Sequence, residues 1–369
     1  MMALAIQLAK RGQYTTSPNP NVGCVIVDSQ GQIVGQGWHH QAGTPHAEVH
    51  ALREASERAR GATAYVTLEP CSHFGRTPPC ANALIDAGVS RVVAAMVDPN
   101  PMVAGSGLAR LEQAGIATSS GLMQAQAEQL NRGFIKRMRT GRPWVTVKLA
   151  ASLDGKTALA NGASKWITGP LARQDVQRHR ALSCAILSGS GTVLADNPLL
   201  NVRFSELGWD QKTLNELALS EKNLRQPLKV LLDGRNQLRP ELRCLQSSSA
   251  ALIINSQVNT LPFARSVTQW QAPYHDNKLD LAAVFDYLGT MQLNHIWVEA
   301  GAKMAGALLQ SKLIDELILY QAPKLMGHAA QDLFTIEPLT DMQQAYSLRW
   351  TDIRQIGVDL KISATVLYN

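Results

Sequence analysis

The sequence contains little that would suit a membrane or a nucleic acid. It has no run of about eighteen apolar residues, the shortest length that favours a membrane-spanning helix. Aromatic residues make up only 5% of its 369 positions, and the net charge of +6 is spread along the chain. Base-stacking platforms and a basic groove are therefore not expected. This composition suits phosphorylated small molecules as ligands, with no nucleic acid and no membrane among the partners.

Cysteine is also scarce, with five residues in the chain. An odd and sparse set does not indicate a disulfide framework. The first residues, "MMALAIQLAKRGQ", reach Lys10 and Arg11 before the apolar core of a signal peptide can form. We therefore expect a cytoplasmic protein whose thiols are reduced, and these thiols either bind a metal or lie buried. The cysteines are Cys24, Cys71, Cys80, Cys184 and Cys244.

The length predicts more than one domain, and both halves show an α/β pattern. The segment "NVGCVIVDSQGQIVGQGW" indicates a β-hairpin, and helical and strand patterns then alternate through "AEVHALREASERAR", "ATAYVTLE" and "RVVAAMV". This order predicts a three-layer α/β fold. The basic amphipathic stretch "NRGFIKRMRTGRPW" ends in Gly-Arg-Pro, where we place a boundary between domains 1–143 and 144–369. A second alternation follows, and the polar span 205–227 is expected to be a surface insertion.

The segments "PHAEVHALREA" and "TLEPCSHFGRTPPCAN" carry the strongest chemical signal. A catalytic zinc usually has three protein ligands and one open position, and His46, Cys71 and Cys80 would supply those three. Glu48 takes the place of the general acid/base in the signature His-x-Glu followed by Pro-Cys and a second Cys. Each ligand segment is expected to open a helix, whose N-terminus favours a thiolate. A structural zinc would need a fourth protein ligand, and none is obvious.

The gap between Cys71 and Cys80 holds eight residues, "SHFGRTPP", where most zinc deaminases have two. A loop of this length can cover a pocket and present Arg76 to a substrate. Two other functions remain open from these residues alone. One is an RNA-binding protein that edits a base, which the composition disfavours. The other is a zinc-stabilised regulatory protein that binds nucleotides, which would have no use for Glu48 beside the metal.

Four segments make the zinc half specific: "TSPNPNVGCVIV", "GWHHQAGTPHAEVHAL", "TLEPCSHFGRTPPC" and "DPNPMVAGSG". They resemble the deaminase domain of the bifunctional deaminase/reductase family of riboflavin biosynthesis, which has a cytidine-deaminase-like fold. That family removes the 2-amino group of 2,5-diamino-6-ribosylamino-4(3H)-pyrimidinone 5′-phosphate. The resemblance implies pyrimidine contacts at Asn19 and His39 and ribose-phosphate contacts at Arg76, Asp98 and Asn100. Asn19 and Asn100 each lie in an Asn-Pro turn, which could equally be architectural.

The second half is similar to the reductase domain of the same family through "KLAASLDGKTA", "SKWITG", "RHRALSCAILSGSGTVLADNPLLNVR" and "IWVEAGAKMAGALL". The resemblance implies a dihydrofolate-reductase-like fold, NADPH as cofactor, and reduction of the ribosyl group to ribityl. The implied substrate positions are Ser164, Arg180, Leu200, Arg203 and Glu299. The implied cofactor positions are Ala150, Trp166, Thr192, Asp196, Gly301, Ala302, Lys303, Met304, Ala305, Gly306 and Ala307.

Three expectations about the second half rest on chemistry rather than on a motif. Arg235 follows the strand "LKVLLDG" and is a candidate for the 2′-phosphate of NADPH, although a solvated loop residue is the alternative. Asp154 could orient the nicotinamide or the sugar, although an Asp-Gly turn explains it equally well. No side chain of this half stands out as a general acid. We also expect a homo-oligomer, although no motif fixes its size.

Overall fold

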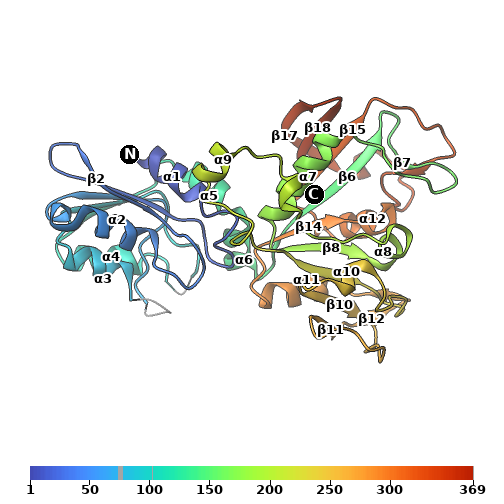
Figure 1. Ribbon diagram of the computed structural model, residues 1–369, viewed down its shortest axis with the longest axis horizontal. Helices are drawn as coiled ribbons and strands as arrows, with labels where there is room; N and C mark the ends of the chain where they lie inside the picture. Colours follow the sequence, from blue (N-terminus) through green and yellow to red (C-terminus); the bar gives the residue numbers. More distant parts are fainter. Residues whose placement is uncertain (74–77, 102, 369) are drawn as a thin grey trace. The chain divides into compact units, whose positions relative to one another are not determined.

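The computed structural model describes residues 1–73, 78–101 and 103–368, and the chain divides into two compact units (Figure 1). Unit 1 comprises Met1–Gly141 and Trp209–Arg225. Unit 2 comprises Arg142–Gly208 and Gln226–Asn369. The polar span 205–227 is largely exposed, as expected of a surface insertion, but its residues Trp209–Arg225 belong to the first unit rather than to the second. Of the helices that the structure describes, none has both the length and the apolar character needed to span a bilayer.

Unit 1 is built on a five-stranded sheet in the order β2-β1-β3-β4-β5. Strand β1 is antiparallel to both of its neighbours, β2 and β3, whereas β3, β4 and β5 run parallel. The antiparallel pair β1–β2 is the hairpin that the sequence predicts. The strands are β1 (Gly23–Val27), β2 (Ile33–Trp38), β3 (Thr63–Val66), β4 (Arg91–Ala94) and β5 (Ala117–Ser120).

Helices cover both faces of this sheet, so unit 1 has the three layers predicted (Figure 1). Alternate residues of β1 enter separate cores: Cys24 and Ile26 pack with α2, α3 and α4, whereas Val25 packs with α1, α5 and α6. The helices are α1 (Met2–Lys10), α2 (Ala47–Ala55), the 3-10 turn η1 (Ser56–Ala59), α3 (Cys80–Asp86), α4 (Ser106–Gln113), α5 (Gln124–Leu130), α6 (Arg132–Thr140) and α9 (Gln211–Glu216).

Glycines in β2 let α2 lie directly on the sheet. A Cβ added at Gly37 would stand 2.3 Å from the carbonyl oxygen of Ala47, and one at Gly35 would stand 2.1 Å from that of Ala51. Both obstacles are backbone atoms, which side-chain rotation cannot move aside. The position of α2, and therefore of the residues at its start, depends on this close approach.

Unit 2 is built on a nine-stranded sheet in the order β11-β10-β9-β8-β14-β6-β15-β18-β17. Neighbouring strands are parallel from β11 to β15, and β18 is antiparallel to both of its neighbours, β15 and β17. The strands of this sheet are β6 (Trp144–Ser152), β8 (Ala185–Gly189), β9 (Leu228–Leu232), β10 (Ala251–Asn255), β11 (Val267–Gln271), β14 (His295–Glu299), β15 (Glu316–Ala322), β17 (Ser347–Ile356) and β18 (Asp359–Leu367).

Two apolar cores sandwich this sheet. One contains α11 and α12 residues such as Phe285 and Leu308, and the other contains Ala172 of α7, Val193 of α8 and Cys244 of α10. The helices are α7 (Pro170–Leu182), α8 (Ser190–Asp196), α10 (Arg243–Gln246), α11 (Leu281–Thr290) and α12 (Ala302–Gln310). The minor elements are β7 (Lys156–Ala158), β12 (Tyr274–His275), β13 (Lys278–Leu279), β16 (Gln331–Asp332), η2 (Phe204–Glu206) and η3 (Met342–Gln344).

The central strands β9, β8, β14 and β6 of unit 2 are parallel neighbours, so their carboxyl ends share one edge of the sheet. The chain leaves β8 directly into α8 and leaves β14 into α12 after a short turn. Ligands of open α/β sheets bind outside the carboxyl ends of the strands. We therefore expect the implied cofactor and substrate positions of the second half to lie at this edge.

Candidate functional site

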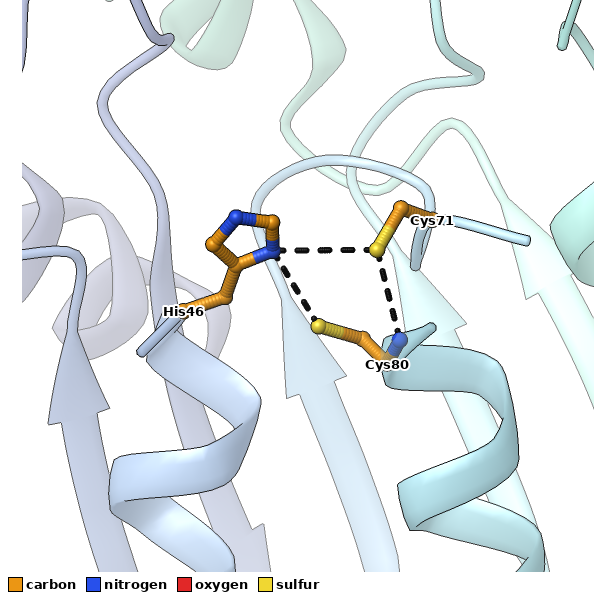
Figure 2. Close-up of side chains that lie close together, drawn as sticks. All are labelled: His46, Cys71 and Cys80. Carbon is orange, nitrogen blue, oxygen red and sulfur yellow. Dashed lines mark hydrogen bonds between the residues drawn. The ribbon is translucent and has the colours of Figure 1, made fainter. Parts of the chain in front are cut away.

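His46, Cys71 and Cys80 converge in unit 1 to form a possible metal centre (Figure 2). Their ligand atoms all lie within 4.8 Å of one another. The Nδ1 of His46 is 3.3 Å from the Sγ of Cys80 and 3.7 Å from that of Cys71, and the backbone N–H of Cys80 donates to the Cys71 sulfur at 3.3 Å. Three protein ligands at this spacing suit a tetrahedral zinc that keeps one position open.

The fold brings the three ligands together from different elements. His46 is the N-cap of α2 and Cys80 is the first residue of α3, and both helices pack on the same face of the sheet. Cys71 lies in the loop that follows β3 and does not open a helix, which corrects the expectation that each ligand segment would do so. The thiolate at Cys71 is instead stabilised by the N–H group at the start of α3.

The electrostatics of the cluster favour metal binding. The interaction between the two thiols lowers the pKa of Cys71 to about 4 and, together with burial, raises the pKa of Cys80. The hydrogen bond with Cys71 raises the pKa of His46. A divalent metal at this position would favour the thiolate form of both cysteines.

Glu48 lies in the first turn of α2 and is only 3% exposed. Burial, with a contribution from the charge of Cys71, raises the pKa of its carboxyl to about 7. Its Oε2 is buried and receives no hydrogen bond from the described residues. A buried polar atom without a partner is costly unless a ligand completes it. A water at the open position of a zinc ion would supply that hydrogen bond, so the residues present fit zinc.

The two residues implied as pyrimidine contacts lie beside the metal ligands. Asn19 Nδ2 is 3.1 Å from His39 Nε2, and the other ring nitrogen of His39 is 3.2 Å from the carbonyl of Pro45. The His39 ring stands edge-on to the His46 ring, with centroids 5.1 Å apart. Burial lowers the pKa of His39 to about 4, so this imidazole is neutral at pH 7. Arg76, the third implied contact, lies outside the described residues.

Glu69 is a residue of this site that the sequence did not single out. Its buried carboxylate accepts hydrogen bonds from the backbone N–H groups of Asp98 at 3.0 Å, Gly105 at 2.9 Å and Gly107 at 2.7 Å. The loop that carries Asp98 and Asn100 is therefore held in place by a side chain that comes just before Cys71. Within the loop, the N–H of Asn100 donates to Asp98 Oδ1 at 2.8 Å. The sequence signal that could have identified Glu69 is an acidic residue placed directly after an apolar strand.

In unit 2, Arg180 of α7 and Glu299 of β14 form a buried, two-pronged ion pair. Arg180 Nε and Nη2 donate to the two carboxylate oxygens at 2.6 and 2.7 Å, and Nη1 donates to the carbonyl of Asn201 at 3.0 Å. Trp297 Nε1 donates to Glu299 Oε1 at 2.8 Å. Burial would raise the pKa of Glu299, but Arg180 outweighs it and the pKa falls to about 2.

Lys148 is placed beside this pair by strand register and is the second residue that the sequence did not single out. The parallel register of β6 and β14 places it opposite Glu299. Burial lowers the pKa of the Lys148 ammonium, against the opposing attraction of Glu299. Strand register and the ion pair thus place Lys148 and Arg180 on two sides of the Glu299 carboxylate. An ammonium that gives up its proton more readily than usual is suited to proton transfer.

The other implied substrate positions differ in what they can offer. Arg203 Nη2 contacts Glu206 Oε2 at 2.6 Å, and both side chains are well exposed. Leu200 has a positive φ of 48°, and its side chain is buried in the core, so only its backbone could meet a ligand. Ser164 is partly exposed and lies in the segment between β7 and α7.

Two glycine-bounded turns at the sheet edge face one another. Gly189 is the N-cap of α8, and a Cβ added there would stand 3.4 Å from the end of the Met304 side chain. Gly301 is the N-cap of α12, and a Cβ added there would meet Thr192 Oγ1 at 3.9 Å. The implied segment from Gly301 to Ala307 is therefore the start of α12. Helix N-termini with little side-chain bulk are ready-made anion sites, which fits a cofactor with phosphates.

The remaining implied cofactor positions are spread around this edge. Ala150 lies in β6 opposite Tyr320 of β15. Trp166 is 65% exposed, and the guanidinium of Arg173 stands 4.6 Å from its ring centroid. Asp196 ends α8, and its carboxylate is 3.5 Å from the Nζ of the residue before Trp166. The ion pair between Lys165 and Asp196 thus joins the segment that carries the exposed indole to the end of α8.

Asp154 and Arg235 have different surroundings. The Asp154 carboxylate accepts hydrogen bonds from the backbone N–H groups of Met326 at 3.0 Å and Gly327 at 2.8 Å, and also from the hydroxyl of Ser152. These bonds favour the turn interpretation of Asp154, because the carboxylate organises the neighbouring loop. Arg235 is exposed in the turn after β9, whose carboxyl end lies at the cofactor edge.

The two units now define a class of protein. A three-layer unit with a His, Cys, Cys set and a buried Glu is a zinc deaminase, and the nine-stranded unit is a nucleotide-binding reductase. Residues 1–96 match the model of the cytidine and deoxycytidylate deaminase zinc-binding region, and residues 143–362 match that of the RibD C-terminal domain. The chain therefore belongs to the RibD family, and it is a deaminase and reductase of riboflavin biosynthesis with zinc and NADPH as cofactors.

Individual relatives agree with this assignment over nearly the whole chain. The chain is 55% identical to the riboflavin biosynthesis protein RibD of Escherichia coli over 97% of its own length and 96% of the relative's. Among solved structures it is similar to RibD of Acinetobacter baumannii, with 43% identity, a TM-score of 0.90, and 100% and 98% of the two chains covered. A deaminase/reductase of Thermotoga maritima gives 30% identity, a TM-score of 0.86, and 99% and 97% coverage.

Proposed function

We propose that unit 1 removes the 2-amino group of 2,5-diamino-6-ribosylamino-4(3H)-pyrimidinone 5′-phosphate, and that unit 2 then reduces the ribosyl group of the product to ribityl. The Thermotoga maritima relative is described as a diaminohydroxyphosphoribosylaminopyrimidine deaminase and 5-amino-6-(5-phosphoribosylamino)uracil reductase. The observation that carries the first activity is the buried, unpartnered oxygen of Glu48 beside three metal ligands.

In the deamination, zinc held by His46, Cys71 and Cys80 supplies, when bound, a water whose pKa is lowered to roughly 7. Glu48 accepts a proton from this water as its oxygen adds to C2 of the pyrimidine. Glu48 would then deliver this proton to the amino group, which leaves as ammonia. The second proton of the water passes from the new C2 hydroxyl to the ring nitrogen as C2 becomes a carbonyl carbon. One carboxylate serves both steps because each proton moves along the same face of the ring.

Recognition of the pyrimidine falls to Asn19 and His39. Because the His39 ring is neutral and its Nδ1 faces a carbonyl, its Nε2 accepts a hydrogen bond from Asn19. The amide oxygen of Asn19 then remains available to the base. The loop with Asp98 and Asn100 is proposed to meet the ribose, and Arg76 is proposed to meet the phosphate, for which a guanidinium is a strong partner.

The test is Glu48→Gln, which keeps the shape of the side chain and removes its base. We expect the variant to retain zinc, measured by metal analysis, and to release ammonia about 10²- to 10⁴-fold more slowly. Glu57→Gln is the matched control, because Glu57 is exposed in the 3-10 turn that follows α2. Turnover near the wild-type rate with full zinc content would refute the role of Glu48.

In the reduction, NADPH supplies a hydride to C1′ of the sugar when bound. We assign Lys148 as the group that protonates O4′ as the C1′–O4′ bond opens, so that hydride and proton together convert ribosyl to ribityl. Glu299 keeps the ammonium in place, and Ser164, Arg180 and Arg203 are proposed to hold the substrate phosphate. The start of α12 and the turn into α8 are proposed to hold the cofactor phosphates, with Trp166 beside the cofactor.

Lys148→Gln tests this assignment. We expect NADPH to bind with unchanged affinity, measured by fluorescence titration, while its substrate-dependent oxidation falls by about 10²-fold or more. Lys278→Gln is the control, since Lys278 is an exposed lysine of the same unit. Oxidation that stays within a few-fold of wild type would exclude Lys148 as the proton donor.

A cytoplasmic location and a homo-oligomeric state stay predictions. The five free cysteines of the chain are consistent with a reducing compartment. Fractionation of cells that express the protein from its own gene would test the location.

A further inference from the structure

The segment Trp209–Arg225 packs within unit 1 and forms one wall of a groove there, with α9 beside the end of α1 (Figure 1). Arg11, which follows α1, donates from Nε to the carbonyl of Glu216 at 2.5 Å, and Trp209 packs edge-on against Tyr14. The opposite wall is formed by residues that follow α1 and residues that follow β2. Residues far apart in the sequence therefore meet around one groove.

The groove consists of two adjoining hollows with volumes of about 340 and 330 Å³. They share Thr15, Gln41 and Asn223, so they form one continuous surface. Each volume lies at the lower end of the range for small-molecule sites, roughly 300–1,000 Å³. Among the described residues, those that line the groove include neither a metal ligand nor a substrate position implied for unit 1. The groove is therefore a candidate site separate from the zinc centre.

The first hollow offers positive charge and hydrogen-bond donors. It is lined by Lys222 and Arg225, and no carboxylate is present among the described residues that line it. The side chain of Lys222 is exposed, and neither its ammonium nor the side-chain amide of Gln41 has a hydrogen-bond partner within the described chain. Donors without acceptors beside two cations favour an anion with several oxygen atoms, and a phosphate group meets this description.

The second hollow is lined by planar groups. The centroid of the His40 ring lies 4.3 Å from that of Trp38 and 4.1 Å from that of His50, on which it is stacked. The guanidinium carbon of Arg11 lies 4.4 Å from the centroid of Trp38, and Leu217 adds an apolar contact. Aromatic side chains and guanidinium planes are the groups that hold the bases of nucleotides. This hollow therefore suits the planar ring of a ligand whose phosphate occupies the first hollow.

We propose that this groove is a second ligand site of unit 1 and that it binds a nucleoside monophosphate. The phosphate lies in the first hollow, where Lys222 and Arg225 neutralise its charge. The base lies in the second hollow, beside Arg11 and Trp38. Both parts of the ligand are needed, because one hollow supplies charge and the other supplies planar surface. The site uses no residue to which a step of deamination or reduction is assigned, so it does not depend on the proposed function.

Protection of Lys222 from acylation tests binding at this place in the full chain loaded with zinc. Uridine 5′-monophosphate is the probe, and peptide mass spectrometry measures how fast each lysine reacts. The probe at saturation should slow the acylation of Lys222 about tenfold or more. Lys212 is the internal control, because it is an exposed lysine of α9 that does not line the groove. Its rate of acylation should not change.

Smaller ligands test whether both hollows take part. Uridine lacks the phosphate and should not protect Lys222. Ribose 5-phosphate lacks the base, so half-protection should need a concentration about tenfold higher than that of the complete nucleotide. Inorganic phosphate at the same ionic strength measures the effect of an oxyanion alone and should protect less than either phosphate ester.

A substitution in the second hollow tests the position of the base. Arg11→Gln removes the planar cation and should raise the concentration of uridine 5′-monophosphate needed for half-protection of Lys222 about tenfold. Arg91→Gln is the matched control, because Arg91 is an exposed arginine of β4 in the same unit and does not line the groove. The zinc content of each variant, measured by metal analysis, shows that unit 1 remains folded.

Three outcomes would overturn the proposal. The first is a Lys222 that uridine 5′-monophosphate fails to protect at about 10 mM, where even a weak specific site would be filled. The second is protection by inorganic phosphate or ribose 5-phosphate that equals protection by the nucleotide. The third is an Arg11→Gln variant whose half-protection concentration stays at the wild-type value. The proposed deaminase and reductase activities, followed by ammonia release and NADPH oxidation, are unaffected by any of these outcomes.

Discussion

The buried ion pair between Arg180 and Glu299 should contribute more to the stability of unit 2 than the exposed ion pair between Arg203 and Glu206. In both pairs the shortest contact is 2.6 Å, but the Arg180 and Glu299 side chains are 11% and 15% exposed, against 42% and 48% for Arg203 and Glu206. Removing one partner of a buried pair leaves an uncompensated charge. Arg180→Leu should therefore lower the free energy of unfolding by about 3–5 kcal/mol, and Arg203→Leu by less than about 1 kcal/mol.

The same ion pair should also make the free energy of unfolding depend on pH. The pKa of Glu299 is lowered from 4.5 to about 2, because Arg180 outweighs the opposing effect of burial. A carboxyl group whose pKa is lower in the folded protein than in the unfolded chain stabilises the fold fully at pH values above its pKa in the unfolded chain. This stabilisation is lost as the pH falls toward its pKa in the folded protein. Here that window runs from pH 4.5 down to about 2, and the contribution is about 3 kcal/mol at 1.36 kcal/mol per pKa unit.

The Arg180→Leu variant should show the opposite trend with pH. Without the guanidinium, burial dominates and raises the pKa of Glu299, so protonation at lower pH relieves the uncompensated charge. The stability difference between wild type and variant should therefore shrink as pH falls from 7 to 4.5. Adding Glu299→Gln to Arg180→Leu should recover part of the loss at pH 7, since the double variant buries a neutral amide.

Urea unfolding of the full chain at pH 7 and pH 4.5 measures these differences, with hydrogen-exchange mass spectrometry of β14 peptides to assign the transition to unit 2. Equal losses for Arg180→Leu and Arg203→Leu at pH 7 would refute the argument from burial. A loss that grows as pH falls would refute the assignment of the lowered pKa to Arg180.

Three further predictions concern the scaffold around the sites. Glu69→Gln should raise the KM of deamination with a smaller change in kcat and no loss of zinc, because the loop with Asp98 loses its charged anchor; an unchanged KM would contradict this. Gly37→Ala should lower stability by about 1–3 kcal/mol through the clash with α2, whereas Gly191→Ala, which meets nothing within 4 Å, should not; equal melting temperatures would exclude the close approach as a constraint. Arg235→Ala should reduce the preference for NADPH over NADH in steady-state kinetics, and an unchanged ratio would leave Arg235 as a solvated loop residue.

Much of this architecture could be predicted from local patterns. The hairpin β1–β2 shows two apolar runs around a turn, and the parallel strands of both units are continuous apolar runs because they are buried on both faces. The metal ligands were predictable for a different reason. The order His-x-Glu, Pro-Cys, Cys is a chemical signature, and the fold only has to bring these short segments to one edge of one sheet.

Elements whose structure depends on distant partners were not predictable in this way. Trp209 packs edge-on against Tyr14, with ring centroids 5.0 Å apart, and a polar span of the second half thereby joins unit 1. No local pattern indicates a contact between such remote positions. The strand β17 was missed because its bulge shifts the register between Trp350 and Asp352, which interrupts the period of two that identifies a strand.

Lys148 shows how a residue can be chemically important without a local signal. In "VTVKLAAS" it is the single charged residue of an otherwise uncharged strand, for which water would be the expected neighbour. Because β6 is a central strand between β14 and β15, Lys148 instead stands opposite Glu299 in the register with the adjacent strand. Burial lowers the pKa of the ammonium while the carboxylate of Glu299 limits that fall, so this ammonium gives up its proton more readily than one on a surface lysine. The assignment of Lys148 as the proposed acid therefore rests on the register of two strands far apart in the sequence rather than on the residue type.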